Sequence, residues 1–353
     1  MTQFLLDYGL FLAKVITVVS AVAAIVMLSV GLSRKGPAGS GSLTVEKLND
    51  KYRDLGRQLR QALLTKAERK KALKQDKQQR KAEEQARNAA DKTDTQADGA
   101  SARRRVFVLD FKGDIRATGV AALREEISAI LSLAGKTDEV VLRLENFGGA
   151  VHEHGLAASQ LQRLRDREIP LTAIVDKGAA SGGYLMACVA NRIIAAPFAV
   201  IGSIGVIAQL PNFHRLLEAR GVDFEQITAG RYKRTVTMFG RNTDEDRAKL
   251  REELEAVHTL FKQAVTTHRP ALDIEAVATG EHWYGTQSRD LGLVDAIETS
   301  DDYLQRAASS ADLYRVSYRA RPTLQQRVLS AIRSSADEAI AWLSQRDHES
   351  RFP

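Results

Sequence analysis

Cysteine is nearly absent from this sequence of 353 residues, because Cys188 is the one example. A single cysteine cannot form an intrachain disulfide, and it says little about the redox compartment. A reactive thiol needs a polar, activating environment, whereas Cys188 lies in an apolar helical pattern. The sequence therefore excludes an intrachain disulfide framework and gives little support to a cysteine nucleophile.

Charged residues are missing from the 19-residue run VITVVSAVAAIVMLSVGLS, which lies between Lys14 and Arg34. A helix of about 20 apolar residues spans a bilayer. A cleaved signal peptide would begin with basic residues and end in a small-residue cleavage site. The first 13 residues contain Asp7 but neither Lys nor Arg, and GPAGSGS after the run has no clear A-x-A pattern. We therefore expect an uncleaved transmembrane anchor in residues 1–35 that contacts the bilayer through residues 9–32.

Basic residues follow the predicted anchor, beginning at Arg34 and Lys35. The positive-inside rule then places the C-terminal bulk of the chain in the cytoplasm. A second apolar region, residues 185–210, contains Asn191, Arg192 and Pro197. These interruptions favour burial in a soluble core over a second membrane span.

The net charge of +7 is concentrated in one segment. Residues 34–105 contain 20 Lys and Arg against 10 Asp and Glu, so this segment carries +10 and the remainder about −3. A basic segment of this kind does not indicate nucleic-acid binding by the folded body. We interpret residues 36–104 as a flexible and helical connector, in which positions 45, 48, 52, 55 and 59 form a short a/d seam. A solvated spacer, self-association and contact with anionic lipid remain open for it.

Strand-like and helix-like segments alternate from residue 105 to residue 312. VFVLDFKG, EVVLRLEN, LTAIVD and RIIAAP have strand patterns, and GVAALREEISAILSLA, GLAASQLQRLRD and GGYLMACVAN have helical patterns. This alternation predicts an α/β layer architecture with parallel pairing. A long helix follows at residues 244–269, and a basic, helical tail is expected at residues 313–353.

Two glycine corners end strands and open helices, at ENFGGAV (residues 145–151) and KGAASGGYLMA (residues 177–187). Backbone N–H groups at such corners lack partners, and glycine allows close approach of a ligand. The two corners could therefore direct two N–H donors at one oxyanion. Ser181 lies on the second corner and is a candidate nucleophile, although a packing turn with a capping serine fits the same residues.

A serine nucleophile needs a general base. No histidine lies between Ser181 and His214, which disfavours a ClpP-like Ser-His-Asp triad. His152 and His154 could form a metal pair, but no third ligand follows at helical spacing, and we predict no metal or cofactor. Lys233, in AGRYKR before the strand-like run 235–239, is an alternative base, because burial favours the neutral amine. A basic surface loop fits the same residues.

Together these motifs resemble the signal peptide peptidase A family of membrane serine peptidases, within it the SohB subgroup. The resemblance covers residues 106–298 and rests on FKGDI, ENFGGAV, KGAASGGYLMA, IGSIGV, AGRYKR and ATGEHWYGTQSRDLGLVDAIE in order. It implies a ClpP/crotonase-like α/β fold of repeated ββα units. It also implies a single-pass protein of the bacterial inner membrane that cleaves hydrophobic peptides as a homo-oligomer.

The resemblance also implies the roles of individual residues. Ser181 would be the nucleophile, Lys233 the general base, and Ser203 of IGSIGV the group that orients Lys233. Gly182 and one glycine of the first corner, with Gly149 preferred over Gly148, would supply the oxyanion hole. Other members often have Ser-Pro-Gly-Gly where this chain has Asn-Phe-Gly-Gly at residues 146–149, so the identity of that second donor stays open.

Two other functions remain possible from the sequence. A crotonase-like acyl-CoA enzyme would share the two donors but use a carboxylate, for which Glu145 is the obvious candidate. A catalytically silent membrane scaffold would use the connector and tail for partners.

Overall fold

The computed structural model describes residues 41–65 and 103–320, together with short runs and single positions within 9–17 and 67–81. Most of the predicted anchor and the C-terminal tail beyond residue 320 lie outside the described residues. Among the described residues, no helix is both long enough and apolar enough to cross a membrane. Residues Leu43–Tyr318 form one compact unit, which is described below.

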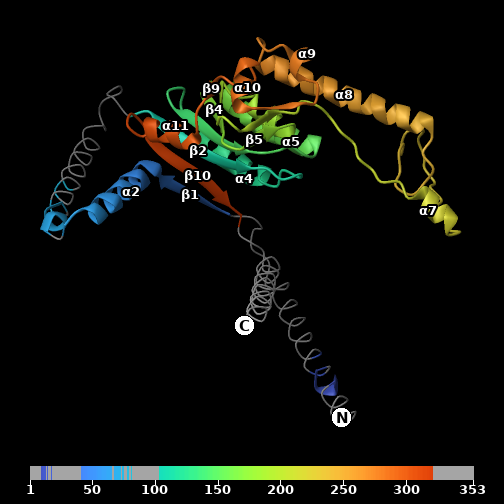
Figure 1. Cartoon of the computed structure of the whole chain (residues 1–353), viewed down its shortest axis with the longest axis horizontal. Helices are drawn as coiled ribbons and strands as arrows, with labels where there is room; N and C mark the ends of the chain where they lie inside the picture. The colour runs from blue at the N-terminus through green and yellow to red at the C-terminus, as the bar shows by residue number, and fades with distance from the viewer. Residues whose placement is uncertain are drawn as a thin grey trace, which may run out of the picture. The chain divides into compact units, whose positions relative to one another are not determined.

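A seven-stranded sheet forms the centre of this unit (Figure 1). Its strands, in spatial order, are β1 (Ser42–Lys47), β10 (Asp312–Arg319), β2 (Arg105–Lys112), β3 (Glu139–Glu145), β4 (Leu171–Val175), β6 (Arg192–Ala195) and β9 (Ala296–Ile297). The pairs from β10 to β9 are parallel. A second sheet contains β5 (Gly178–Ala180), β7 (Val200–Gly202) and β8 (His282–Tyr284).

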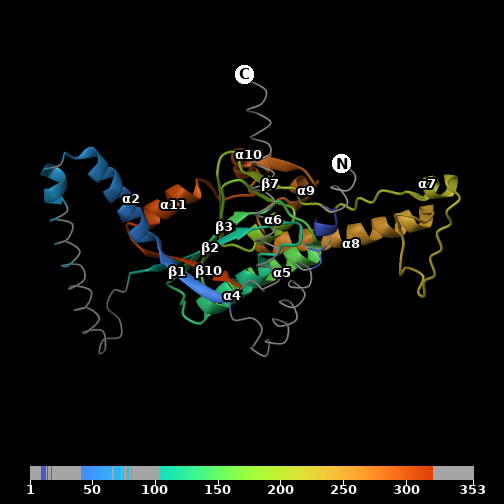
Figure 2. The same cartoon turned by 90° about the horizontal axis from the view of Figure 1, so that it is seen from below.

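Helices cover both faces of the large sheet (Figure 2). The helices of the unit are α2 (Leu48–Leu63), α4 (Val120–Leu131), α5 (Val151–Asp166), α6 (Gly182–Ala187), α7 (His214–Ala219), α8 (Asp244–His268), α9 (Ile274–Val277), α10 (Gly285–Asp290) and α11 (Ser300–Ala307). Among them, α7 lies away from the sheets. The side chains of β2 alternate between the two cores. Phe107 and Leu109 pack in the core that contains α4, α5 and α6 residues, whereas Val108 packs with residues of α2 and α11. Burial of both faces explains why these strands read as near-continuous apolar runs.

The predicted α/β alternation is confirmed, and residues 185–204 supply much of the core, whereas residues 207–210 of the predicted apolar region are exposed. Three further segments differ from the prediction. The first residues of the expected helical tail form β10, because Leu313 and Val316 are buried beside β2. Residue 45 lies in β1, so the helix of the connector begins only at Leu48. The strand expected at residues 235–239 is a loop, where Thr237 bonds to Asn242 and Gly240 instead of to a neighbouring strand.

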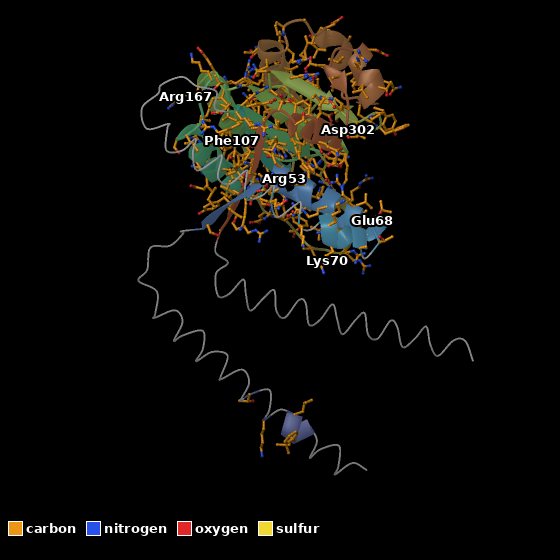
Figure 3. All side chains as sticks on the ribbon, turned by 90° about the vertical axis from the view of Figure 1, so that its left-hand side faces the viewer. Arg53, Glu68, Lys70, Phe107, Arg167 and Asp302 are labelled. Carbon is orange, nitrogen blue, oxygen red and sulfur yellow. The ribbon has the colours of Figure 1, made fainter. Side chains whose placement is uncertain are left out.

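The connector helix α2 carries several charged side chains, among them Arg53 (Figure 3). Leu48 at its start is buried against the sheet, whereas Leu55 and Leu59 are exposed. The apolar seam predicted for this segment therefore contacts the body only near its first turn.

Candidate functional site

Ser181 lies on a sharp corner between β5 and α6. Its φ of 53° and ψ of −122° place a non-glycine residue in a strained backbone region. Its main-chain N–H donates to Gly202 O at 2.8 Å. Its side chain forms no helix-capping bond, so the capping role considered from the sequence does not occupy Oγ. The hydroxyl is therefore free to act in chemistry.

Ser203 lies beside this corner because of strand register. β5 and β7 are parallel, and Ala180 pairs with Gly202. The next residues of the two strands are Ser181 and Ser203, and neighbouring strands lie about 5 Å apart. Ser203 also has a positive φ, 51°, and its N–H donates to Glu281 O at 2.6 Å. The structure thus brings together the predicted nucleophile and the predicted orienting serine.

The first glycine corner packs against the same serine. Asn146 continues β3 and bridges to Ala179 of β5. A Cβ atom added to Gly148 would lie 2.7 Å from Ser181 Cβ and 3.0 Å from its Oγ. Gly149, with φ of 154°, follows immediately. The two corners, 32 residues apart in sequence at Gly149 and Ser181, therefore meet at one point.

The main-chain N–H groups of the two corners differ in whether they have an acceptor among the described residues. Gly148 N–H donates to the side-chain oxygen of Asn146 at 2.9 Å. Within the described part of the chain, the N–H groups of Gly149 and Gly182 donate to no protein acceptor. This difference favours Gly149 over Gly148 as the second donor, and the assignment of Gly149 stays a prediction.

Within a single chain, Lys233 does not lie near Ser181. It is exposed in the loop between α7 and α8, and its N–H donates to Gly230 O at 3.1 Å. Its neighbours Arg231 and Tyr232 contact the first turns of α8 through Glu245 and Lys249. Figures 1 and 2 both show this loop and α7 beyond the N-terminal end of α8, away from the sheets.

The length of α8 gives an estimate of the distance between the Lys233 loop and Ser181. Glu245 contacts the loop of Lys233, whereas Phe261 of the same helix lines the pocket at Ser181. Sixteen helical residues separate the two positions, which corresponds to about 24 Å along the axis. A single chain therefore does not assemble the predicted Ser–Lys pair.

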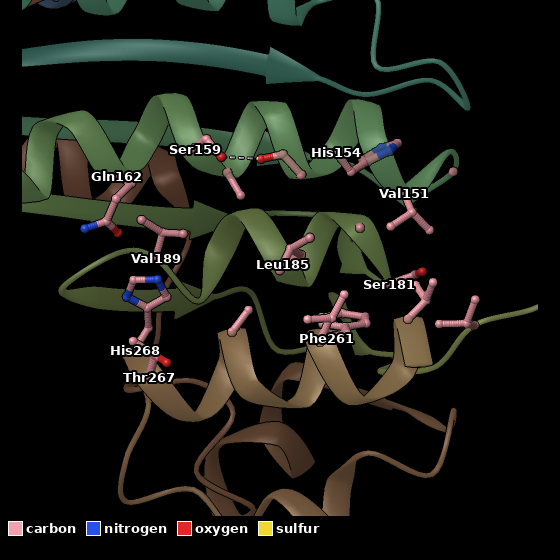
Figure 4. A pocket seen from close by; sticks show the side chains of 18 of the residues that line it. Val151, His154, Ser159, Gln162, Ser181, Leu185, Val189, Phe261, Thr267 and His268 are labelled. Carbon is pink, nitrogen blue, oxygen red and sulfur yellow. Dashed lines mark hydrogen bonds between the residues drawn. The ribbon is translucent and has the colours of Figure 1, made fainter. Parts of the chain in front are cut away.

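An apolar pocket of about 510 Å³ opens beside Ser181 (Figure 4). It lies between α5, α6 and the second half of α8. Apolar side chains form most of its wall: Val151, Ala158, Leu185, Val189, Val257, Leu260, Phe261 and Ala264. Figure 4 shows Ser181 and His154 at one end, and Gln162 and His268 at the other. The pocket is suited to an apolar group of a ligand that binds beside Ser181.

Other titratable groups near the site do not offer a nucleophile or base. Burial raises the pKa of Cys188 to about 12, so its thiol stays protonated. Burial lowers the pKa of His268, and Arg165 lowers it further, but Figure 4 shows this side chain at the opposite end of the pocket from Ser181. Glu145 accepts a hydrogen bond from Lys177, which lowers its pKa, and Lys112 adds a second ion pair. Glu145, the carboxylate considered for crotonase-like chemistry, therefore forms ion pairs with Lys112 and Lys177 at the surface.

The two histidines of the considered metal pair do not act together. The side chain of His152 is 83% exposed, whereas His154 is fully buried. The ring nitrogens of His154 contact Ala150 O and Asn146 Oδ1 at 2.9 and 3.2 Å, and neither contacts Ser181. A Ser–His pair is therefore not formed with His154. No pattern in the sequence predicted the contact between His154 and Asn146. The same is true of the pocket wall that α8 forms.

Comparison with known families and proteins places this chain among peptidases. Residues 3–161 match the family described as Peptidase family S49 N-terminal, and residues 163–314 match Peptidase family S49. A protein of Haemophilus influenzae named "Probable protease SohB" is 46% identical over 92% of this chain and 92% of its own length. One of the same name from Buchnera aphidicola is 53% identical over 67% of this chain and 71% of its own.

More distant similarities extend to a plant protein and to solved structures. The chloroplastic serine protease SPPA of Arabidopsis thaliana is 31% identical over 53% of this chain and 28% of its own length. A mutant of the 1510-N membrane-bound stomatin-specific protease in complex with a substrate peptide is 13% identical, with a TM-score of 0.42, over 66% of this chain and 99% of its own.

Proposed function

Because the chain belongs to peptidase family S49, we propose that it is a membrane-anchored serine endopeptidase that hydrolyses peptide bonds in hydrophobic peptides. The observation that carries this proposal is the meeting of the two glycine corners at Ser181. A strained serine with a free hydroxyl, two N–H groups without acceptors and an apolar pocket lie within one small region. This is the arrangement that acyl transfer needs.

The reaction follows from these parts. A base removes the proton of Ser181, and Oγ attacks the carbonyl carbon of the scissile peptide bond. Negative charge develops on the carbonyl oxygen, where the N–H groups of Gly182 and Gly149 stabilise it. The amine leaves with a proton, and water then releases the acyl group from Oγ. Hydrophobic peptides fit because the neighbouring pocket is lined mainly by apolar side chains.

We retain Lys233 as the general base and propose that a second copy of the chain supplies it. Lys233 is exposed on a segment that projects from the body. Large apolar side chains on this segment are also exposed, which is typical of an interface. They are Ile207, Leu210, Phe213, Leu216, Val222, Phe224 and Ile227. In a homo-oligomer, this segment of one copy reaches Ser181 of its neighbour, where burial would favour a neutral amine and Ser203 would orient it.

The proposed location is the bacterial inner membrane, with a single span in residues 9–32. Its support is the uncharged run in the sequence and the bacterial sources of the similar SohB proteins. The basic residues after the run favour a cytoplasmic catalytic unit.

Labelling with a fluorophosphonate probe, combined with a hydrophobic fluorogenic peptide assay, tests the proposed chemistry. We expect the wild-type chain to be labelled and to cleave the peptide, and Ser181→Ala to lose both properties while remaining folded. Ser132→Ala, at an exposed serine that follows α4, should behave as wild type. Labelling or cleavage that persists in Ser181→Ala would exclude this residue as nucleophile. A folded wild-type chain without either property would favour the silent scaffold.

A further inference from the structure

Asn146 is a fully buried polar residue between the two glycine corners. Its main chain joins the first corner to β5, since its N–H donates to Gly178 O at 2.8 Å and its carbonyl accepts from Ala180 N at 3.0 Å. Its side-chain oxygen accepts from Gly148 N–H, and its side-chain nitrogen lies 3.2 Å from Met186 Sδ. Every polar atom of this residue is therefore engaged around Ser181.

His154 completes this arrangement from α5. It is also fully buried, and its Nε2 lies 3.2 Å from Asn146 Oδ1. Asn146 Oδ1 accepts from Gly148 N–H, and the Nδ1 atom of His154 lies 2.9 Å from the carbonyl oxygen of Ala150, so each ring nitrogen faces an acceptor. The contact with Asn146 is a hydrogen bond in the form of the ring that carries a hydrogen on Nε2, which then donates to Oδ1. The imidazole also lies directly against Gly182, because a Cβ atom added there would be 2.5 Å from His154 Cγ. The pair thus contacts both corners that carry the candidate oxyanion donors.

We propose that Asn146 and His154 are positioning residues of the oxyanion hole. The bond from Gly148 N–H to Asn146 fixes the peptide plane before Gly148, and the chain then turns so that Gly149 N–H is left without an acceptor. His154 holds the Asn146 side chain in place and supports the Gly182 backbone from behind. This inference rests on the proposed acyl-transfer function, and it adds two residues that act through the oxyanion donors and not on the reacting atoms.

The physical reason for such a pair is preorganisation. Oxyanion donors lower a barrier only if they are aimed before charge develops, and the loss of one donor costs about 10²- to 10³-fold in rate. Two glycine corners are inherently variable in conformation. A buried side-chain network that fixes both corners removes this variability.

Two substitutions separate the contributions of the pair. Asn146→Ala removes the acceptor of Gly148 N–H. His154→Phe keeps a ring against Gly182 but removes the donor to Asn146, and it leaves Asn146 Oδ1 still bonded to Gly148. His152→Phe is the matched control, because His152 lies on the same helix with its side chain 83% exposed.

The assay compares peptide hydrolysis with binding of a peptide aldehyde, which forms a tetrahedral adduct with a reactive serine. We expect kcat/KM to fall roughly 10- to 100-fold in Asn146→Ala and by a smaller factor in His154→Phe, mainly through kcat. Aldehyde affinity should fall by the same factor, while affinity for the product peptide and the Tm remain near wild type. The double variant should be no worse than Asn146→Ala, because both residues act as one unit. Wild-type kcat and aldehyde affinity in folded Asn146→Ala would overturn the inference.

Hydrogen exchange measured by mass spectrometry separates this inference from the proposed function. In the full-length Asn146→Ala chain, residues 146–151 should exchange faster than in wild type, with β3 unchanged. This result requires no catalysis. If the wild-type chain neither cleaves peptides nor reacts with fluorophosphonate, the proposed function fails, and exchange alone decides whether Asn146 fixes the corner. Unchanged exchange would then overturn the positioning role.

Discussion

At the scale of single residues, close packing explains why glycines surround Ser181. A Cβ atom at Gly183 would overlap the main-chain oxygen of Asn146. That oxygen accepts the bond from Ala180 N–H, which holds β5 to the first corner. The small residue after Gly182 therefore allows the two corners to approach each other.

Gly183→Ala should separate the corners and reduce both stability and activity. Overpacking against backbone that is already bonded costs about 1–3 kcal/mol. We expect a lower Tm and loss of fluorophosphonate labelling. Gly135→Ala is the control, since a Cβ atom at Gly135 meets nothing within 4 Å. A Gly183→Ala chain with wild-type labelling would show that the corners tolerate separation.

At the scale of elements, α8 is both a pocket wall and a projecting helix. Only Phe261 and Val265 of this helix are buried. Its C-terminal end is tied to the sheet, because Arg269 contacts Asp295 at 2.7 Å and Asp295 accepts from Ile193 N–H of β6, also at 2.7 Å. This ion pair therefore fixes the wall of the pocket relative to the sheet.

Asp295→Asn should destabilise the unit by about 2 kcal/mol near neutral pH, as expected for a hydrogen bond to a charged group. Burial alone would raise the pKa of Asp295, but the bonds from Arg269 and Ile193 N–H outweigh it, so the pKa is lowered from 3.8. A carboxyl group whose pKa is lowered by folding stabilises the fold at pH values above its pKa in the unfolded chain. This stabilisation is lost as the pH falls through the pKa of the folded state.

Urea unfolding at several pH values measures this effect. The stability difference between wild type and Asp295→Asn should be constant at neutral pH and shrink below about pH 4. Asp290→Asn, at an exposed position of α10, should differ little from wild type at any pH. A difference that grows on acidification would contradict the assigned sign.

At the scale of the whole molecule, a single chain holds Ser181 and Ser203 together but leaves Lys233 exposed on its projecting segment. The proposed homo-oligomer accounts for both this exposure and the apolar side chains of the segment. A base supplied by a second copy also makes a prediction that distinguishes it from a site formed within one chain.

Mixing two inactive variants should restore activity. Ser181→Ala keeps the base and Lys233→Ala keeps the nucleophile, so a mixed oligomer contains some sites with both. Random assembly into a closed ring gives about one quarter of the wild-type activity. Activity is measured with the hydrophobic peptide after the two chains are co-expressed. Each variant alone is the control, and a mixture without activity would contradict a base supplied by a second copy.

Much of the fold could be predicted because its signals are local. Apolar runs of four to eight residues indicated β2, β3, β4 and β6, and helical periodicity indicated α4, α5 and α8. Short strands with glycine, such as β5 and β7, had no such signal. The pairing of β10 with β2 joins residues about two hundred positions apart, which local pattern cannot reveal.

The sequence by itself determined the local chemistry of this protein: a serine between small residues, two glycine corners, an uncharged membrane-length run and the motifs of a peptidase family. Tertiary structure alone decided which groups meet. Strand register placed Ser203 beside Ser181, side-chain bonds of Asn146 distinguished Gly149 from Gly148, and the length of α8 kept Lys233 apart. The reason is physical: a residue's conformation depends on its neighbours in sequence, whereas a site depends on contacts between distant segments.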